Sequence, residues 1–229
     1  MAKLDRTASS IVYASYLGGT QADRARSIAV DLFGQAYVTG DTVSPNFPVT
    51  PGAYQTTYSA GPQGRAFYGG DAFVAKFNRF GSGLVYATYL GGSEEDMGGD
   101  LAVDLIGSAY VLGSTSSPDL PTTANALQSA IGGGTCILNP TFSWPCRDIF
   151  VVKLNLFGSG APFATYLGGG EDDFHAILAR PPVFFEPPGQ RTVFVSGTTC
   201  SVDFPTAGAF QGSLGGACDT FFARVSQIP

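Results

Sequence analysis

The chain has 229 residues, of which only 13% are Asp, Glu, Lys or Arg, whereas 31 are Gly and 15 are Pro. This low charged share and this abundance of turn formers argue against a helical fold and favour many short strands. The net charge of −6, with Lys and Arg scattered singly, offers no basic patch for a phosphate backbone, so nucleic acid is excluded as an expected partner.

Membrane insertion is not expected either. No stretch of about 18 uninterrupted apolar residues occurs in the sequence. The opening residues, Met1 to Asp5, have neither the apolar core of a signal peptide nor an anchor. We therefore expect a soluble and already mature segment.

The dominant feature is a threefold repeat. Tyr-Leu-Gly-Gly occurs at residues 16–19, 89–92 and 166–169, and each copy leads into a polar loop that carries an aspartate, Asp23, Asp96 or Asp173. Further landmarks follow in the same order in each copy: 28–31, 101–104 and 177–179; then 36–40, 109–113 and 192–197; then 71–77, 148–154 and 219–225. Such ordered recurrence predicts a repeat architecture.

Taken in chain order, the first full copy predicts four strands, at residues 28–31, 36–40, 71–77 and 84–90. Each is short, rich in Val, Ile, Phe or Tyr, and bounded by Gly, Asp or Pro. We expect an antiparallel meander with a tight turn after the first strand and a long loop before the third. In the third copy, residues 180–190 replace that tight turn.

The predicted fold is all-β, a β-propeller-like array of three four-stranded antiparallel blades. A four-stranded unit must stack on its neighbours to bury both faces, and radial stacking gives a propeller. A linear β-solenoid is the alternative, but its coils are usually much shorter than this repeat. The expected segments are an N-terminal strand that completes a blade at 1–19, and blades at 20–92, 93–169 and 170–229.

The repeated strings resemble the bacterial SBBP β-propeller repeat family. The resemblance rests on Tyr-Leu-Gly-Gly, Ile-Ala-Val-Asp, Ala-Tyr-Val-Thr-Gly and Asp-Ala-Phe-Val-Ala-Lys, and it extends over nearly the whole chain. It implies a secreted or surface-exposed bacterial propeller, usually a module of a larger protein and without a shared catalytic site.

The two ends of the chain complement each other. Residues 1–19 match residues 74–92, so the chain begins inside a third strand and offers a fourth strand, with Ile11, Val12, Tyr13, Tyr16 and Leu17, that belongs to no complete blade. The last unit stops after its third strand. We expect residues 9–17 to complete the last blade, either in cis, which gives a ring of three blades, or in trans, which gives a closed dimer or a filament. Trans pairing is favoured. The third alternative is that the chain is an excerpt of a longer array of blades.

Four cysteines predict two loop clamps and an oxidising compartment. Cys200 follows the second strand of the third unit and Cys218 precedes its third strand, while Cys136 and Cys146 share the corresponding loop of the second unit. We expect Cys136–Cys146 and Cys200–Cys218 disulfides. Free thiols or a zinc site are the alternative, which the absence of a CxxC spacing disfavours.

The search for chemistry yields no catalytic residues and no cofactor. Aspartates that recur once per unit, including Asp23, Asp96 and Asp173, are expected to accept backbone N–H bonds in turns. Calcium binding is the less favoured role for such residues. It is considered because carboxylates, which supply hard oxygen ligands, cluster in two places. The candidate calcium residues are Glu94, Glu95, Asp96, Glu171, Asp172 and Asp173.

The expected function is that of a non-enzymatic structural or adhesive module outside the cell or at the cell surface, which assembles with itself. A propeller that binds a glycan or a surface protein is the alternative, and a hydrolase is a lesser one. Aromatic residues in the long loops would contact a ligand in the binding alternative, or otherwise hold the loops to the blades. These residues are Tyr54, Tyr58, Tyr68 and Trp144.

Overall fold

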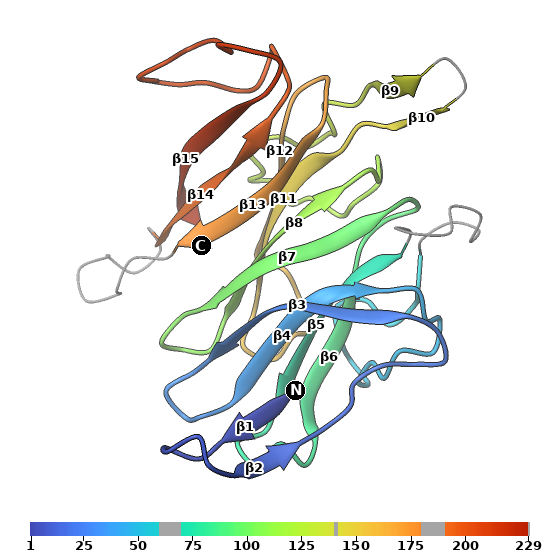
Figure 1. Ribbon diagram of the computed structural model, residues 1–229, viewed down its shortest axis with the longest axis vertical. Helices are drawn as coiled ribbons and strands as arrows, with labels where there is room; N and C mark the ends of the chain where they lie inside the picture. The colour runs from blue at the N-terminus through green and yellow to red at the C-terminus, as the bar shows by residue number, and fades with distance from the viewer. Residues whose placement is uncertain (60–69, 140–141, 180–190, 229) are drawn as a thin grey trace.

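The computed structural model of the chain is all-β (Figure 1). It describes residues 1–59, 70–139, 142–179 and 191–228. Within these ranges no helix is long and apolar enough to span a membrane. The described strands form two four-stranded sheets, one three-stranded sheet and two hairpins.

The three larger sheets follow the repeats of the sequence, and each is antiparallel with its strands in chain order. The first sheet consists of β3 (Asp23–Val30), β4 (Ala36–Thr42), β5 (Asp71–Phe77) and β6 (Leu84–Leu90). The second consists of β7 (Asp96–Val103), β8 (Ala109–Thr115), β11 (Asp148–Leu154) and β12 (Phe163–Leu167). The third consists of β13 (Asp173–Ala179), β14 (Arg191–Thr199) and β15 (Asp219–Ile228).

The expected strand order and type are therefore confirmed, with one difference at the first strand of each sheet. This strand begins at the repeated aspartate, several residues before the apolar string that predicted it. A register shift lies within each of these strands, for example between Ala25 and Ser27 in β3. A bulge of this kind breaks the period-two alternation, so the polar first half does not read as a strand in the sequence.

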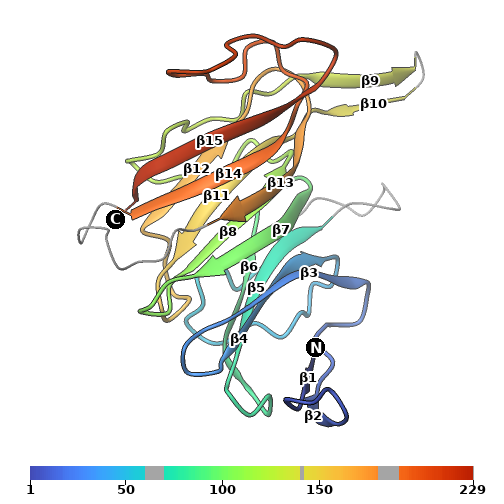
Figure 2. The same cartoon turned by 60° about the vertical axis from the view of Figure 1, so that its left-hand side comes forward.

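Two of the three buried clusters lie between the sheets, because alternate residues of each inner strand face opposite neighbours, and the third lies on the outer face of the first sheet. Tyr37 and Val74 of the first sheet join one buried cluster with Val111 and Phe150 of the second. The other face of the second sheet packs on the third in a separate cluster. Figures 1 and 2 show the sheets arranged one beyond another as a stack that does not close on itself.

The N-terminal strand does not complete the last sheet within the chain. Instead, β2 (Ile11–Ala14) pairs with β1 (Ala2–Leu4) in a hairpin, and the third sheet has three strands in the part of the chain that the structure describes. The hairpin and the third sheet lie at opposite ends of the stack (Figures 1 and 2). The expected alternative of cis pairing, with a three-bladed ring, is thus not what the structure shows.

A second hairpin, which the sequence did not predict, lies in the long loop of the second repeat. It consists of β9 (Thr135–Asn139) and β10 (Phe142–Pro145), and it projects from the stack beside the third sheet (Figure 1). Residues 180–190, where the third repeat departs from the pattern, lie outside the described residues.

Candidate assembly site

The tyrosine of each internal Tyr-Leu-Gly-Gly string is an anchor for the fourth strand of its sheet. Tyr89 at the end of β6 is fully buried, and its hydroxyl donates to the carbonyl oxygen of Ser44 at 2.8 Å. Tyr166 at the end of β12 is also fully buried and donates to Ser117 in the same way, again at 2.8 Å. A buried phenol needs such a partner, so each tyrosine fixes its strand to the turn after the second strand.

An aromatic pair packs beside Tyr89 and, together with the serine carbonyl that accepts its hydrogen bond, forms a buried site that we call the socket. Phe47 lies with its ring centroid 5.9 Å from that of Tyr89 and 4.6 Å from that of Phe73. The third sheet carries the same pair, since the centroids of Phe204 and Phe221 are also 4.6 Å apart. The third sheet therefore has the aromatic pair that surrounds the tyrosine in the first sheet, although no fourth strand lies beside it among the described residues.

Tyr16 is the counterpart of Tyr89 and Tyr166 in the N-terminal string, yet its side chain is fully exposed. It follows β2, in which Ile11 is 63% and Val12 56% exposed. Tyr13 and Leu17 are half-buried, and Leu17 packs against the outer face of the first sheet. Of the five residues expected to form the assembly strand, three thus remain largely open to solvent.

The backbone register of β2 is already that of a fourth strand. In the first sheet the pairs include Ala75 with Ala87, Lys76 with Tyr86 and Phe77 with Leu84. The hairpin repeats this pattern with its own residues: Ala2 pairs with Ala14, Lys3 with Tyr13 and Leu4 with Ile11. Because β1 has the sequence of the end of a third strand, it occupies the edge of β2 that a complete third strand would use.

The repeated aspartates accept hydrogen bonds from the turns that contain the Gly-Gly pairs, which we call corners. Backbone amides of Gly19, Gly92 and Gly169 donate to Asp23, Asp96 and Asp173 at 2.8, 2.7 and 2.8 Å. A serine hydroxyl of the neighbouring turn donates to each of the same carboxylates, from Ser44, Ser117 and Ser201. These contacts are the turn bonds expected from the sequence.

Two junctions between sheets contain buried aspartates, and burial raises the pKa of these carboxyl groups. Asp71 and Asp96 flank Gly91, where an added Cβ would lie 3.1 Å from Asp71 Oδ1 and 2.6 Å from Asp96 Oδ2. Burial, with a smaller contribution from the Asp71 charge, raises the pKa of Asp96 to about 7. At the next junction burial and the Asp173 charge raise the pKa of Asp148 to about 7. These carboxyl groups are therefore held partly protonated near neutral pH.

The candidate calcium residues differ in their exposure to solvent and in their hydrogen-bond partners. Glu94 and Glu171 are exposed, whereas Asp96 and Asp173 are buried beneath the corners. Asp172 accepts a hydrogen bond from the Arg147 amide at 2.9 Å. Among the described residues, one group of three potential ligands lies within 4.8 Å, namely Cys136, Cys146 and Glu171, and its two sulfurs are bonded to each other.

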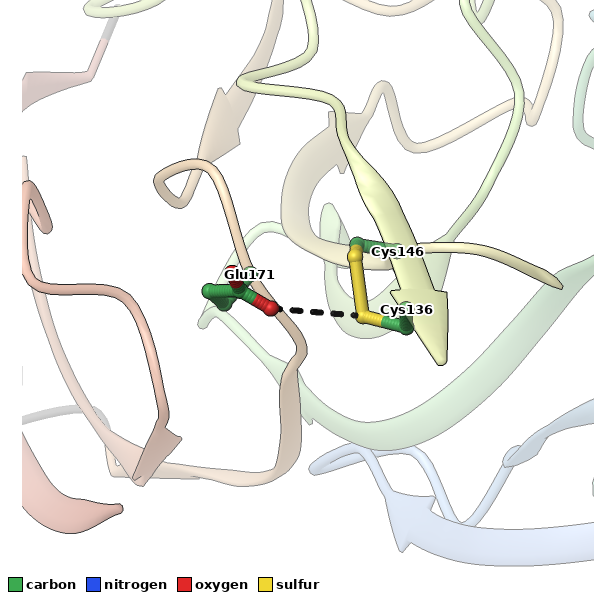
Figure 3. Close-up of side chains that lie close together, drawn as sticks. All are labelled: Cys136, Cys146 and Glu171. Carbon is green, nitrogen blue, oxygen red and sulfur yellow. Dashed lines mark hydrogen bonds between the residues drawn. A yellow bond between two sulfur atoms is a disulfide. The ribbon is translucent and has the colours of Figure 1, made fainter. Parts of the chain in front are cut away.

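The two disulfides are those expected from the sequence, Cys136–Cys146 and Cys200–Cys218. The first is buried at the base of the β9–β10 hairpin, and the Glu171 carboxylate approaches Cys136 Sγ at 3.9 Å (Figure 3). The second joins β14 to β15 at the mouth of the last long loop, and Cys218 is exposed. Such clamps are compatible with an oxidising compartment outside the cell.

Two of the loop aromatics, Tyr54 and Tyr58, pack on the sheets. Tyr54 is half-buried against the core between the first and second sheets, and Tyr58 lies edge-on to Tyr89 with centroids 5.8 Å apart. Trp144 donates from Nε1 to Asp172 Oδ2 at 3.3 Å. Tyr68 lies outside the residues that the structure describes.

Sequence reasoning did not identify the serine whose carbonyl accepts the tyrosine hydrogen bond, which is Ser44 for Tyr89 and Ser117 for Tyr166; Ser201 holds the same position in the third repeat. Ser44, Ser117 and Ser201 each stand two residues after a threonine, Thr42, Thr115 and Thr199, and each serine amide donates to that threonine's hydroxyl. This Thr-x-Ser spacing recurs in all three copies, so the repeat alignment contained the signal.

Comparison with protein-family models gives a match at the N-terminal end of the chain. Residues 12–48 match the model of the SBBP family, described as a beta-propeller repeat, and no curated protein matches the chain. The matched range begins in β2 and continues through β3 and β4, so it joins the N-terminal strand to the first sheet. Residues 12–48 are thus similar to a β-propeller repeat of the SBBP family.

Proposed function

We propose that the chain is a non-enzymatic structural or adhesive propeller module that acts outside the cell or at its surface and assembles by β-strand complementation. In this assembly, β2 of one copy becomes the fourth strand of the third sheet of another copy. The product is a closed oligomer or a head-to-tail filament, depending on whether the rotation between copies closes.

The observation that carries this proposal is the contrast between one exposed tyrosine and its two buried counterparts. Tyr16 is fully exposed, whereas Tyr89 and Tyr166 are fully buried in sockets formed by their own sheets. The third sheet provides Ser201, Phe204 and Phe221 in the positions of such a socket. A tyrosine placed there would exchange contact with water for a buried hydrogen bond and aromatic packing.

Strand exchange also gains backbone pairing. β1 provides β2 with three paired residues, Ala2, Lys3 and Leu4, whereas β5 provides β6 with six. β15 is as long as a complete third strand, and its residues Ala223, Arg224 and Val225 repeat the pattern of β1. Its outer edge has no hydrogen-bonded strand in the described part of the chain. An open edge of this kind favours addition of a strand from another molecule.

The compartment and the absence of catalysis are proposed on separate grounds. Two disulfides in a chain of 229 residues suit an oxidising exterior better than a reducing cytosol. The carboxyl groups with raised pKa values, Asp96 and Asp148, are fully buried and bonded within corners. Burial in a corner suits a role in holding the sheets together rather than contact with a substrate.

The test is the assembly state of the purified chain, measured by light scattering over a range of concentrations and by electron microscopy. The wild-type chain is expected to form dimers or filaments, and Tyr16→Ala is expected to remain monomeric. The matched control is Phe210→Ala, which removes an equally exposed aromatic ring from the last long loop. A wild-type chain that stays monomeric, or a Tyr16→Ala variant that assembles normally, would refute the proposal.

A further inference from the structure

The outer face of the third sheet is an apolar surface that has no sheet against it in the described part of the chain. Phe222 is 72% exposed and Ile177 65% exposed, and both lie on this face together with Phe194. The rings of Phe194 and Phe222 stack with centroids 5.6 Å apart and an interplanar angle of 15°. Exposed apolar side chains grouped in this way mark a contact surface rather than ordinary surface variation.

The counterparts of these residues show what such a face contacts. Phe194 occupies the position of Tyr37 and Tyr110, three residues before the glycine of the second strand in each repeat. Phe222 likewise stands where Val74 and Val151 stand in the other repeats. Those four counterparts are fully buried, each in a cluster that includes residues of the following sheet. The face with Phe194 and Phe222 therefore has apolar residues in the positions that pack against the following sheet elsewhere in the chain.

The opposite end of the stack presents the matching surface. Leu101 and Leu178, near the ends of β7 and β13, point toward the preceding sheet and lie in the cores of the two internal junctions. Their counterpart in the first sheet, Ile28, is 55% exposed and lines a pocket with Met1 and Tyr13 of the hairpin. Val30 of the same strand is 62% exposed. At Ile28 and Val30 the first sheet thus exposes side chains in positions that its neighbours use to contact a preceding sheet.

One glycine shows that the part of this face beside β3 is unoccupied, whereas Met1 and Leu17 pack on another part of it. A Cβ added at Gly107 would lie 3.2 Å from the hydroxyl of Tyr37, which donates to the Gly107 carbonyl at 3.1 Å across the junction. A Cβ added at Gly34, the same position in the first sheet, would find nothing within 4 Å. The place beside Gly34 is therefore open to the residue that corresponds to Tyr37 in a preceding sheet, and Phe194 is that residue in the third sheet.

We infer that the Phe194–Phe222 face of one copy docks on the Ile28–Val30 face of a second copy of this chain, as successive sheets do within the chain. This inference rests on the proposed self-association and adds a second contact to it. A copy whose β2 completes the third sheet of its neighbour would place its own first sheet next in the stack. Strand pairing and face packing then form one continuous junction with the geometry of the two internal ones.

The test uses full-length chains with charges placed on the two faces. Phe222→Glu and Ile28→Lys are each expected to weaken self-association at least tenfold in sedimentation velocity, because each buries an unpaired charge at the junction. An equimolar mixture of the two variants is expected to recover association at least tenfold over either variant alone, since Glu and Lys then face each other. Phe157→Glu, at an exposed phenylalanine in the turn after β11, is the matched control and should associate as the wild type does.

Folding is checked on the same samples by thermal melting. Both substituted side chains are largely exposed in the isolated chain, so the monomers should melt close to the wild type. Normal association of Phe222→Glu and Ile28→Lys, or a mixture without recovery, would overturn the face contact. If Tyr16→Ala is monomeric in the same experiment, strand complementation stands without the face contact. A monomeric wild type would overturn both.

Discussion

Tyr16 and Tyr89 occupy the same position of two consecutive repeats, but Tyr89 is completely buried and Tyr16 is completely exposed. The difference arises from their strands: β6 lies beside the seven-residue β5, whereas β2 lies beside the three-residue β1. A strand with so short a partner and an anchoring side chain in water is ready to exchange that partner for a longer one.

The hydroxyl of Tyr16 should matter separately from its ring. Tyr16→Phe keeps the aromatic contact with Phe204 and Phe221 but removes the hydrogen bond expected to the Ser201 carbonyl. The loss of one such bond is worth about 1 kcal/mol, or about fivefold in affinity. Sedimentation of the variant should show association weakened by about this factor, well short of the loss in Tyr16→Ala. Equal loss in both variants would mean that the ring contributes nothing.

The same substitution at the internal counterpart should act on stability instead. Tyr89→Phe removes two hydrogen bonds, because the hydroxyl donates to the Ser44 carbonyl and accepts from the Phe47 amide at 3.1 Å, whereas the direct bond from the Phe47 amide to the Ser44 carbonyl remains. A hydrogen bond of this kind contributes about 0.5–1.5 kcal/mol to stability. We expect a lower free energy of unfolding for Tyr89→Phe in urea titration. Tyr16→Phe is its control and should leave the stability of the monomer unchanged, because Tyr16 has no buried partner there.

The buried carboxyl of Asp96 should make the chain less stable as the pH rises. Its pKa is about 7 in the folded chain and 3.8 ordinarily, so between these values the folded state holds a proton that the unfolded state lacks. The free energy of unfolding therefore falls with rising pH, by about 1.4 kcal/mol per pH unit for one such group. In Asp96→Asn this slope should be smaller by that amount, because the amide does not titrate.

Urea titrations at several pH values between roughly 4 and 7 measure this slope. The control is Asp119→Asn, which changes an exposed carboxyl whose pKa is lowered by the hydrogen bonds from Ser93. Because folding lowers the pKa of Asp119, this carboxyl does not contribute to the fall in stability with rising pH, so its variant should retain that fall. An unchanged slope in Asp96→Asn would show that Asp96 stays ionised in the folded chain.

The two disulfides should differ in their rate of reduction. Cys136 is 6% and Cys146 0% exposed, whereas Cys218 is exposed to solvent. A thiolate reductant must reach the sulfur it attacks, and the Glu171 carboxylate beside Cys136 repels its negative charge. Alkylation and mass spectrometry under native conditions should therefore find Cys200 and Cys218 modified first. Glu171→Gln should speed reduction of Cys136–Cys146 and leave the other bond unaffected; reduction of the buried bond first would contradict this account.

The repeat made most of the fold predictable. The strands at 36–40, 71–77 and 84–90 were predicted because each is an apolar string between turn residues. The Cys200–Cys218 pair followed from adjacent antiparallel strands, and the Cys136–Cys146 pair from a shared loop. The pairing of β2 with β1 was not foreseen, although the repeat alignment placed the first residues at the end of a third strand, because so short a remnant was not expected to hold the fourth strand. The β9–β10 hairpin was missed because it lies within a loop that has no counterpart string in the other copies.

The candidate site was predicted in part. Alignment of the repeats identified Tyr16 and its strand, and it identified the aspartates that cap the corners. It could not show that Tyr89 and Tyr166 are buried while Tyr16 is exposed, because exposure depends on which strands are neighbours. The apolar face with Phe194 and Phe222 was also invisible in the sequence, where the same positions read as ordinary core residues.

The most direct test of strand complementation is an intermolecular cross-link between β2 and β15. Ala87 pairs with Ala75 in the first sheet, and the corresponding residues are Ala14 in β2 and Ala223 in β15. Ala14→Cys and Ala223→Cys are made in separate chains, mixed, and treated with a short thiol-to-thiol cross-linker. We predict a covalent dimer that contains one chain of each variant and is absent when either variant is treated alone. If the mixture gives no such dimer, while Ala2→Cys combined with Ala14→Cys in one chain cross-links internally, then β2 stays with β1 and the central claim is wrong.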